Sequence, residues 1–206
     1  MRLKRGSKIN FFNKDGEWES EIIFLDKDRA EVKFLKKVKE SSNSSNIELA
    51  ICLVKKSPME TILQKATELG VSKIIPIISE RTEIKELNFE RAKKIVIEAT
   101  EQSNQLTPPE IFEVTKLKDF LNSLDSSTIL LFADVNSKNN LKKEALNKAK
   151  SLVVLVGPEG DFSPSEIELI QANANVVPFT ISRNILRSDT AVISAISLVN
   201  FINNFH

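Results

Sequence analysis

The sequence is poor in histidine, the side chain that most often transfers protons in enzymes at neutral pH. Its 206 residues contain a single histidine, the terminal His206, and chain ends usually fray. This disfavours a Ser-His-Asp hydrolase, a cysteine enzyme with a paired histidine, and a histidine-ligated zinc site. Any chemistry must use carboxylates, arginine, lysine, backbone amides or a cofactor, and we expect no bound metal.

Cysteine is equally scarce, because Cys52 is the only one. It lies in the apolar run Leu49–Val54, which predicts a buried, reduced thiol rather than a nucleophile, and no intrachain disulfide can form. The apolar runs are only as long as strands, and the first residues lack a signal-peptide pattern. We expect a cytoplasmic protein that does not enter a membrane.

The usual phosphate-binding motifs are also absent. The chain has neither Gly-x-Gly-x-x-Gly nor Gly-x-x-x-x-Gly-Lys-Ser/Thr, so ordinary dinucleotide and P-loop sites lose support. The net charge is +1, with 11 basic against 8 acidic residues in 1–46 (+3) and therefore −2 in the remainder. A surplus this small fits a solvated surface as well as it fits contact with nucleic acid.

The length allows one good-sized domain and a small one. Three short β segments are expected first, at Lys8–Phe12, Glu17–Leu25 and Arg29–Leu35. Asp15-Gly16 is a hairpin signal between the first two, and three short strands suggest a small barrel or a fragment of one. The polar run Ser41–Asn46 indicates a linker, so we place a domain boundary between residues 1–46 and 47–206.

Beyond the linker, strands alternate with helices, which predicts an α/β domain with right-handed crossovers and a mostly parallel sheet. We expect strands at Leu49–Val54, Lys73–Ser79, Thr128–Ala133, Leu152–Val156 and Val176–Phe179. We expect helices from a capping box at Ser57-Pro58-Met59-Glu60 to Gly70, over Asn88–Asn104, from about Leu141, from Pro164, and from Ser188 to about Asn203. The last helix is apolar nearly all round, which places it in the core or in a subunit interface; we favour an interface, and hence a dimer.

The stretch from Leu152 to Glu166 is the most informative part of the chain. A fully apolar strand leads into the glycine-rich turn Gly157–Gly160, and Ser163 and Glu166 form a capping box that opens the next helix. Ligands gather at such strand ends in α/β sheets. The turn is therefore a candidate cofactor cradle, with a simple tight connection as the alternative.

Two further polar stretches are candidates. In Ile185–Thr190, Ser188 is expected to be an N-cap, and Arg187 is either paired with a carboxylate or directed at a ligand. In Glu98–Ser103, Glu98 and Gln102 lie four residues apart on one helix face, although most polar helix ends are simply solvated.

Five motifs, in this order, resemble the RsmE family of ribosomal RNA uridine-N3 methyltransferases: Lys65–Val71, Ser79–Thr82, Glu98–Ser103, Gly157–Gly160 and Ile185–Thr190. The resemblance runs from about Leu3 to the end. It implies a SPOUT fold with a deep C-terminal trefoil knot over 47–206 and a small, here incomplete, PUA-like RNA-binding β-barrel over 1–46. It also implies S-adenosylmethionine as cofactor, N3 of a uridine in 16S rRNA of the small ribosomal subunit as acceptor, and a homodimer formed through the knotted domain.

The same resemblance implies roles for individual residues. Arg187 would face the reacting base, Glu98, Gln102 and Ser103 would support the substrate, with Glu98 also a catalytic candidate, and Arg81 would contact RNA phosphate. The proton acceptor stays open among Glu98, Glu101 and solvent. The implied cofactor contacts are Leu131, Phe132, Ala133, Gly157, Pro158, Glu159, Gly160, Ile181, Ile185, Leu186 and Thr190.

Three positions depart from the family pattern. The family usually has glycine where this chain has Asp161 and Ser182, and arginine where it has Gln105. We expect Ser182 to occupy a backbone conformation that favours glycine. Gln105 keeps open a SPOUT methyltransferase for another RNA site. A non-catalytic RNA-binding ribosome assembly factor is a further alternative, although a protein without a cofactor would not need Gly157 and Gly160. The remaining alternative is an unrelated doubly wound enzyme that uses a nucleotide.

Overall fold

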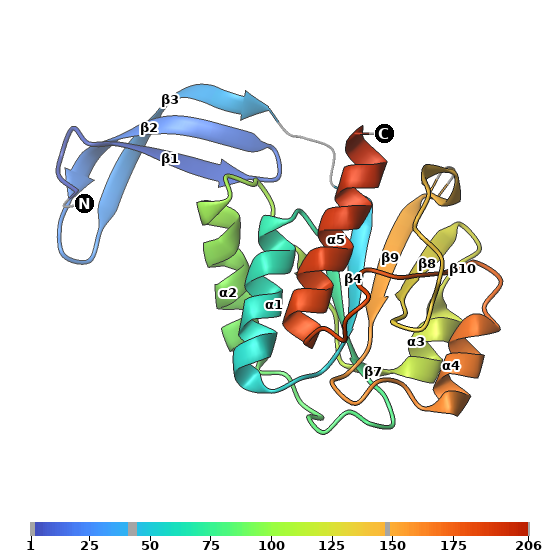
Figure 1. Cartoon of the computed structure of the whole chain (residues 1–206). Helices are drawn as coiled ribbons and strands as arrows, with labels where there is room; N and C mark the ends of the chain where they lie inside the picture. The colour runs from blue at the N-terminus through green and yellow to red at the C-terminus, as the bar shows by residue number, and fades with distance from the viewer. Residues whose placement is uncertain (1–2, 41–44, 147–148, 206) are drawn as a thin grey trace. The chain divides into compact units, whose positions relative to one another are not determined.

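The computed structural model describes residues 3–40, 45–146 and 149–205 (Figure 1). The chain divides into two compact units, one of residues 1–44 with 104–107 and the other of residues 45–103 with 108–206. The expected linker Ser41–Asn46 falls largely on residues 41–44, which lie outside the described residues.

The smaller unit is a three-stranded antiparallel sheet of β1 (Lys8–Asn13), β2 (Gly16–Leu25) and β3 (Ala30–Glu40), in that order. The three expected β segments are confirmed, and the last is longer than expected. The hairpin pairs Asn13 with Gly16, whose φ of 147° suits glycine. One sheet face carries the aromatic contact between Phe11 and Phe34, with ring centroids 5.8 Å apart. Closure of this unit into a PUA-like barrel stays a prediction.

The larger unit contains a seven-stranded sheet in which every pair is parallel, so the expected α/β class and parallel sheet are confirmed. The strand order is β10-β8-β9-β4-β5-β6, and β7 also pairs with β5. The strands are β4 (Ile47–Cys52), β5 (Lys73–Ile78), β6 (Glu110–Ile111), β7 (Thr115–Lys116), β8 (Thr128–Ala133), β9 (Ser151–Val156) and β10 (Val176–Phe179).

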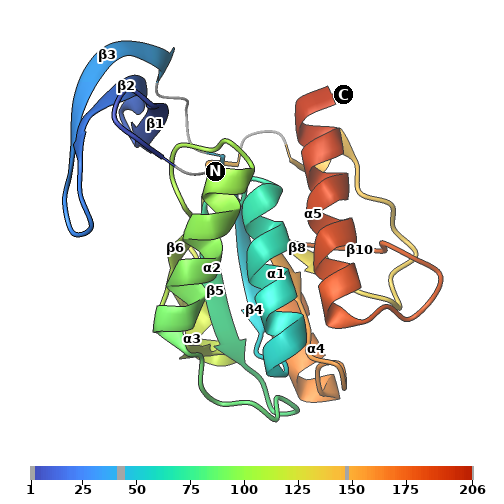
Figure 2. The same cartoon turned by 90° about the vertical axis from the view of Figure 1, so that its left-hand side faces the viewer.

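Helices cover both faces of this sheet. One face carries α1 (Lys56–Glu68), α2 (Phe89–Gln102) and α5 (Ser188–Phe205), with α1 between the other two (Figure 2). The other face carries α3 (Leu117–Ser123) and α4 (Pro164–Gln171). Strand β9 shows why both layers form: Leu152 and Val154 belong to the first core, and Val153 and Leu155 to the second.

Helix α5 packs through one stripe of buried residues, Val192, Ala195, Ile196 and Val199, while Phe201 stays 52% exposed. Its stripe contributes to the same core as α1. Among the described residues, no helix is both long and apolar enough to cross a bilayer. A dimer interface on the outer side of α5 stays a prediction.

Two helix expectations are wrong. Helix α1 begins at Lys56, after Lys55 and without a side-chain cap, because only three residues separate it from β4; Ser57 therefore lies inside the first turn. No α-helix starts near Leu141 in the described residues, where there is only a 3-10 turn, η1 (Lys143–Ala145). Residues 147–148 lie outside the description.

The central position of β9 predicts a large effect of cavity formation there. Leu155 is completely buried, so Leu155→Ala should lower the free energy of unfolding by about 2–5 kcal/mol. Urea denaturation followed by circular dichroism measures this loss. Ile97→Ala is the control, because Ile97 is 46% exposed and its truncation should change stability by about 0.5 kcal/mol or less. Equal effects of the two substitutions would contradict this description of the core.

Candidate functional site

A cavity of about 300 Å³ lies where β8, β9 and β10 end and α5 begins. Its walls are backbone and mostly small or apolar side chains, and its charged lining residues are both acidic, Glu159 and Asp161. We call it the strand-end cavity. The full lining is Ala133, Val135, Val156, Gly157, Pro158, Glu159, Gly160, Asp161, Ile181, Ser182, Asn184, Ile185, Leu186, Ser188 and Ala191.

The structure brings together most of the residues that the resemblance assigns to a cofactor. Eight of them line the strand-end cavity: Ala133, Gly157, Pro158, Glu159, Gly160, Ile181, Ile185 and Leu186. Leu131 and Phe132 are buried in β8, with 0% and 2% of their surface exposed, and Thr190 is exposed in the first turn of α5. These three do not belong to the lining.

Asp161 explains how the glycine-rich turn ends. Its φ is 61°, the left-handed region that favours glycine and next admits Asn and Asp. Its N–H donates to the carbonyl of Pro158 at 3.0 Å, and its Oδ1 accepts the N–H of Phe162 at 2.8 Å. An aspartate therefore meets the local requirement that glycine meets in the family pattern. Ser182 was expected to need such a conformation and does not have a positive φ, so that expectation is wrong.

Gly157 permits a close approach of the turn to an aromatic ring. A Cβ added there would lie 3.0 Å from the ring of Phe162. That ring in turn packs edge-to-face on Phe132, with centroids 5.8 Å apart. Phe132 therefore supports the turn from below rather than lining the cavity.

The expected capping box at the start of α4 is confirmed. The hydroxyl of Ser163 accepts the N–H of Glu166 at 3.3 Å, and Glu166 Oε2 accepts the N–H of Ser163 at 3.0 Å. Glu166 is only 7% exposed. Its other oxygen accepts the N–H of Glu80 at 2.8 Å, which joins the loop after β5 to the start of α4.

Arg81 follows Glu80 in that loop, and the structure gives it a partner that the sequence did not indicate. Its Nη1 donates to the carbonyl oxygen of Gly160 at 2.8 Å. The guanidinium therefore contacts the glycine-rich turn. The strand-end cavity lies on the opposite side of this turn.

Cys52 at the end of β4 is buried, as expected. Burial raises the pKa of its thiol to about 12, against the smaller lowering effect of the Ser79 and Thr82 hydroxyls. A thiol that stays neutral near pH 7 is a poor nucleophile. Cys52 is therefore a buried packing residue beside the loop after β5, which carries Ser79 and Thr82.

Arg187 lies at the start of α5, between two lining residues of the cavity, Leu186 and Ser188. Its side chain is exposed, and it forms no ion pair with a carboxylate of the described residues. Its carbonyl accepts the N–H of Ala191 at 2.8 Å. Ser188 is thus already inside the helix, and the expectation that it is the N-cap is wrong.

Glu98 and Gln102 do not meet Arg187 within one chain. They line a different hollow of about 490 Å³ between α1 and α2. Glu98 is nine residues after the start of α2, about 14 Å along the helix axis from its first residue. Helix α1 separates α2 from α5 (Figure 2). Ser103 is the C-cap of α2, and its hydroxyl donates to the carbonyl of Ala99 at 2.7 Å.

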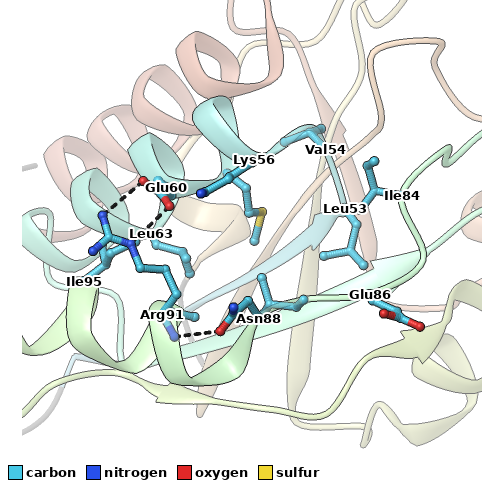
Figure 3. A pocket seen from close by; sticks show the side chains of 13 residues that line it. Leu53, Val54, Lys56, Glu60, Leu63, Ile84, Glu86, Asn88, Arg91 and Ile95 are labelled. Carbon is cyan, nitrogen blue, oxygen red and sulfur yellow. Dashed lines mark hydrogen bonds and ion pairs between the residues drawn. The ribbon is translucent and has the colours of Figure 1, made fainter.

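A further pocket of about 400 Å³ lies between the first turns of α1 and α2 (Figure 3). Its floor includes Leu53, Leu63 and Ile95. At its edge, Arg91 Nε pairs with Glu60 Oε1 at 3.1 Å, and this hydrogen bond holds the pKa of the Glu60 carboxyl below its usual value. This pocket could not be predicted from the sequence, because its lining residues come from separate elements.

The described residues contain no group of three or more histidine, cysteine, aspartate or glutamate side chains arranged to hold a metal ion.

Comparison with known proteins gives consistent matches. Residues 39–200 match the model of a family described as RNA methyltransferase domain. The chain is 33% identical over 208 residues to the ribosomal RNA small subunit methyltransferase E of Rickettsia conorii, covering 99% of this chain and 84% of that protein.

Two solved structures are similar over nearly the whole chain. One is a ribosomal RNA small subunit methyltransferase E from Neisseria gonorrhoeae bound to S-adenosyl methionine, with a TM-score of 0.89 and 28% identity, covering 97% of this chain and 85% of that one. The other is a putative methyltransferase from Legionella pneumophila in complex with SAM, with a TM-score of 0.80 and 27% identity, covering 96% and 84%.

The packing of the turn on Phe162 leads to a stability prediction. Gly157→Ala would place a methyl group 3.0 Å from the Phe162 ring and should cost about 1–3 kcal/mol of unfolding free energy. Gly160→Ala is the matched control, because its added Cβ comes no closer than 3.8 Å to Arg81. Chemical denaturation of both variants compares the two positions, and an equal loss would show that the Phe162 contact is not the cause.

Proposed function

The chain belongs to the RsmE family of RNA methyltransferases, and from this membership we propose that it transfers a methyl group from S-adenosylmethionine to ribosomal RNA of the small subunit. The observation that carries the proposal is the strand-end cavity, which combines the glycine-rich turn with eight of the residues that the family resemblance assigns to the cofactor. The similar structures from Neisseria gonorrhoeae and Legionella pneumophila contain the same cofactor.

The residues of the cavity fit this cofactor chemically. Its volume of about 300 Å³ is at the lower end of ordinary ligand pockets. Ala133, Val135 and Ile181 offer apolar wall for a purine ring, and backbone groups of the turn offer hydrogen bonds. S-adenosylmethionine carries a positive sulfonium, and Glu159 and Asp161 give the cavity the opposite charge.

In the finer form of the proposal, the acceptor is N3 of a uridine. The cofactor supplies an already activated methyl group, so the protein has to align the base and stabilise it as N3 loses its proton. Arg187 is the group we propose for this stabilisation, because it is exposed beside the cavity and makes no ion pair with a described carboxylate. The N-terminus of α5 adds positive potential at the same place.

Glu98, Gln102 and Ser103 keep a proposed role on the substrate side. Glu98 and Glu101 both lie on α2, in the hollow beside α1. Within one chain neither is beside Arg187, so the proton acceptor we propose is either solvent or, in the homodimer proposed below, Glu98 or Glu101 of the second copy.

Family membership also supports three finer structural proposals: a trefoil knot in residues 47–206, a PUA-like RNA-binding unit in residues 1–46, and a homodimer through the knotted domain. It supports a location in the cytoplasm as well. A knot requires one end of the chain to pass through a loop formed by another segment, so such segments have to lie in contact. The loop after β8 and the end of β10 do touch, because the N–H of Thr180 donates to the carbonyl of Asn139 at 2.9 Å.

The direct test is transfer of labelled methyl from S-adenosylmethionine to small ribosomal subunits that lack the modification. We expect incorporation into the RNA and one strong reverse-transcription stop at a uridine, because N3 methylation removes a base-pairing donor. Large subunits serve as the control substrate. Cofactor binding without transfer would favour the assembly-factor alternative, and a stop at a different base would favour another RNA site.

The proposed role of Arg187 predicts that a positive charge alone at this position does not support full methyl transfer. Arg187→Lys should lower kcat by about 10² or more, since a lysine lacks the planar, multiply donating guanidinium. Lys118→Arg is the control: Lys118 is exposed on α3, on the other face of the sheet, and the variant should keep the wild-type rate. Single-turnover methyl transfer measures both. A full rate in Arg187→Lys would rule out this role.

A further inference from the structure

Arg81 is the exposed arginine that the family resemblance directs toward RNA phosphate, yet its guanidinium is engaged with the protein itself. Nη1 donates to the carbonyl oxygen of Gly160 at 2.8 Å. The aliphatic part of Arg81 also lies along this glycine, because a Cβ added to Gly160 would be 3.8 Å from both Cβ and Cδ of Arg81.

The short loop that carries Arg81 is fixed by its own hydrogen bonds. The N–H of Ser79 donates to Thr82 Oγ1 at 3.0 Å, the two hydroxyl oxygens are 2.8 Å apart, and the N–H of Thr82 donates to the carbonyl of Ser79 at 3.2 Å. Both side chains are buried, at 4% and 3% exposure. Arg81 therefore projects from a rigid base.

The residue before Arg81 makes a second attachment to the same region. Glu166 Oε1 accepts the N–H of Glu80 at 2.8 Å, while Glu166 Oε2 accepts the N–H of Ser163 at 3.0 Å. The loop after β5 thus holds Gly160 through Arg81 and the start of α4 through Glu80. These two points bracket Asp161, whose left-handed backbone ends the turn.

Gly160 and its neighbours form a thin wall. Pro158, Glu159 and Gly160 line the strand-end cavity on one side and a small hollow of about 90 Å³ on the other. Of these two cavities, Arg81 lines the smaller one. Arg81 therefore contacts the turn from the side opposite the strand-end cavity.

We propose that Arg81 is a positioning residue for the cofactor: its bond to the Gly160 carbonyl fixes the wall of the strand-end cavity, and RNA phosphate is not its main partner. The inference rests on the proposed function, in which that cavity holds S-adenosylmethionine. Without the bond, the turn would have to be ordered when the cofactor binds, and this ordering cost would weaken binding.

The test uses the full-length protein and two variants. Arg81→Met keeps the apolar stem and removes the donor, and Arg81→Lys keeps a donor of different geometry. Isothermal titration with S-adenosylmethionine should show a Kd raised about tenfold for Arg81→Met, the size expected for one lost hydrogen bond from a charged group. Arg81→Lys should recover part of that loss. Lys94→Gln, an exposed lysine on the same unit, should bind as the wild type does.

RNA binding supplies the readout that separates the two roles. Affinity for small ribosomal subunits without cofactor, measured across a range of salt, should be the same for Arg81→Met and the wild type. A phosphate contact would instead lower the slope of log K against log salt by about 0.7–0.9. A circular dichroism melt within about 3 °C of the wild type excludes a general loss of fold.

Three outcomes would overturn the inference. Unchanged cofactor affinity with a reduced salt slope would make Arg81 a phosphate contact. No change in either measurement would remove both roles. Failure of the wild-type protein itself to bind S-adenosylmethionine would reject the proposed function first, and this inference with it.

Discussion

Strand β9 is buried on both faces and paired on both sides, and the rest of the larger unit depends on this placement. It lies between β8 and β4, and its side chains alternate between the two cores. Residues 152–156 of this strand are accordingly all apolar, and its backbone pairs with β8 and β4. The strand leaves this buried layer at Gly157, where the turn that lines the cavity begins. The strand-end cavity is therefore a consequence of how the sheet is buried.

The parts of the fold that depend on local sequence could be predicted. The apolar run before Gly157 and the Ser163–Glu166 box define a strand, a turn and a helix start within fifteen residues, and all three are present. The start of α1 could not be predicted the same way, because the three-residue connection from β4 overrode the capping signal at Ser57. The two-residue strands β6 and β7 were missed, because such short strands are defined by their pairing with β5. The helix α3 was also missed, because its seven residues are too few for a clear helical period.

The site shows the same division. Family resemblance indicated eight of the fifteen residues that line the cavity, since these eight lie in the glycine-rich turn and at or after the ends of β8 and β10. It did not indicate what holds the turn, because Arg81 and Gly160 are 79 positions apart and Glu80 and Glu166 are 86 apart. The resemblance gave glycine for both positions 161 and 182, and of these two only Asp161 has a positive φ. The four-residue spacing predicted that Glu98 and Gln102 share one helix face. It could not predict that Arg187 lies away from them.

The parallel pairing of β4 with β9 has a consequence for synthesis of the chain. Leu49 pairs with Val154, about a hundred residues later. At a translation rate of roughly 5–20 residues per second, β9 would be synthesised about 5–20 s after β4. One edge of β4 would stay unpaired for that time. During that interval the completely buried residues Ala50 and Ile51 lack their partners in β9, Leu155 and Val156. The nascent larger unit should therefore be prone to aggregation, and be a target for chaperones, until β9 has left the ribosome.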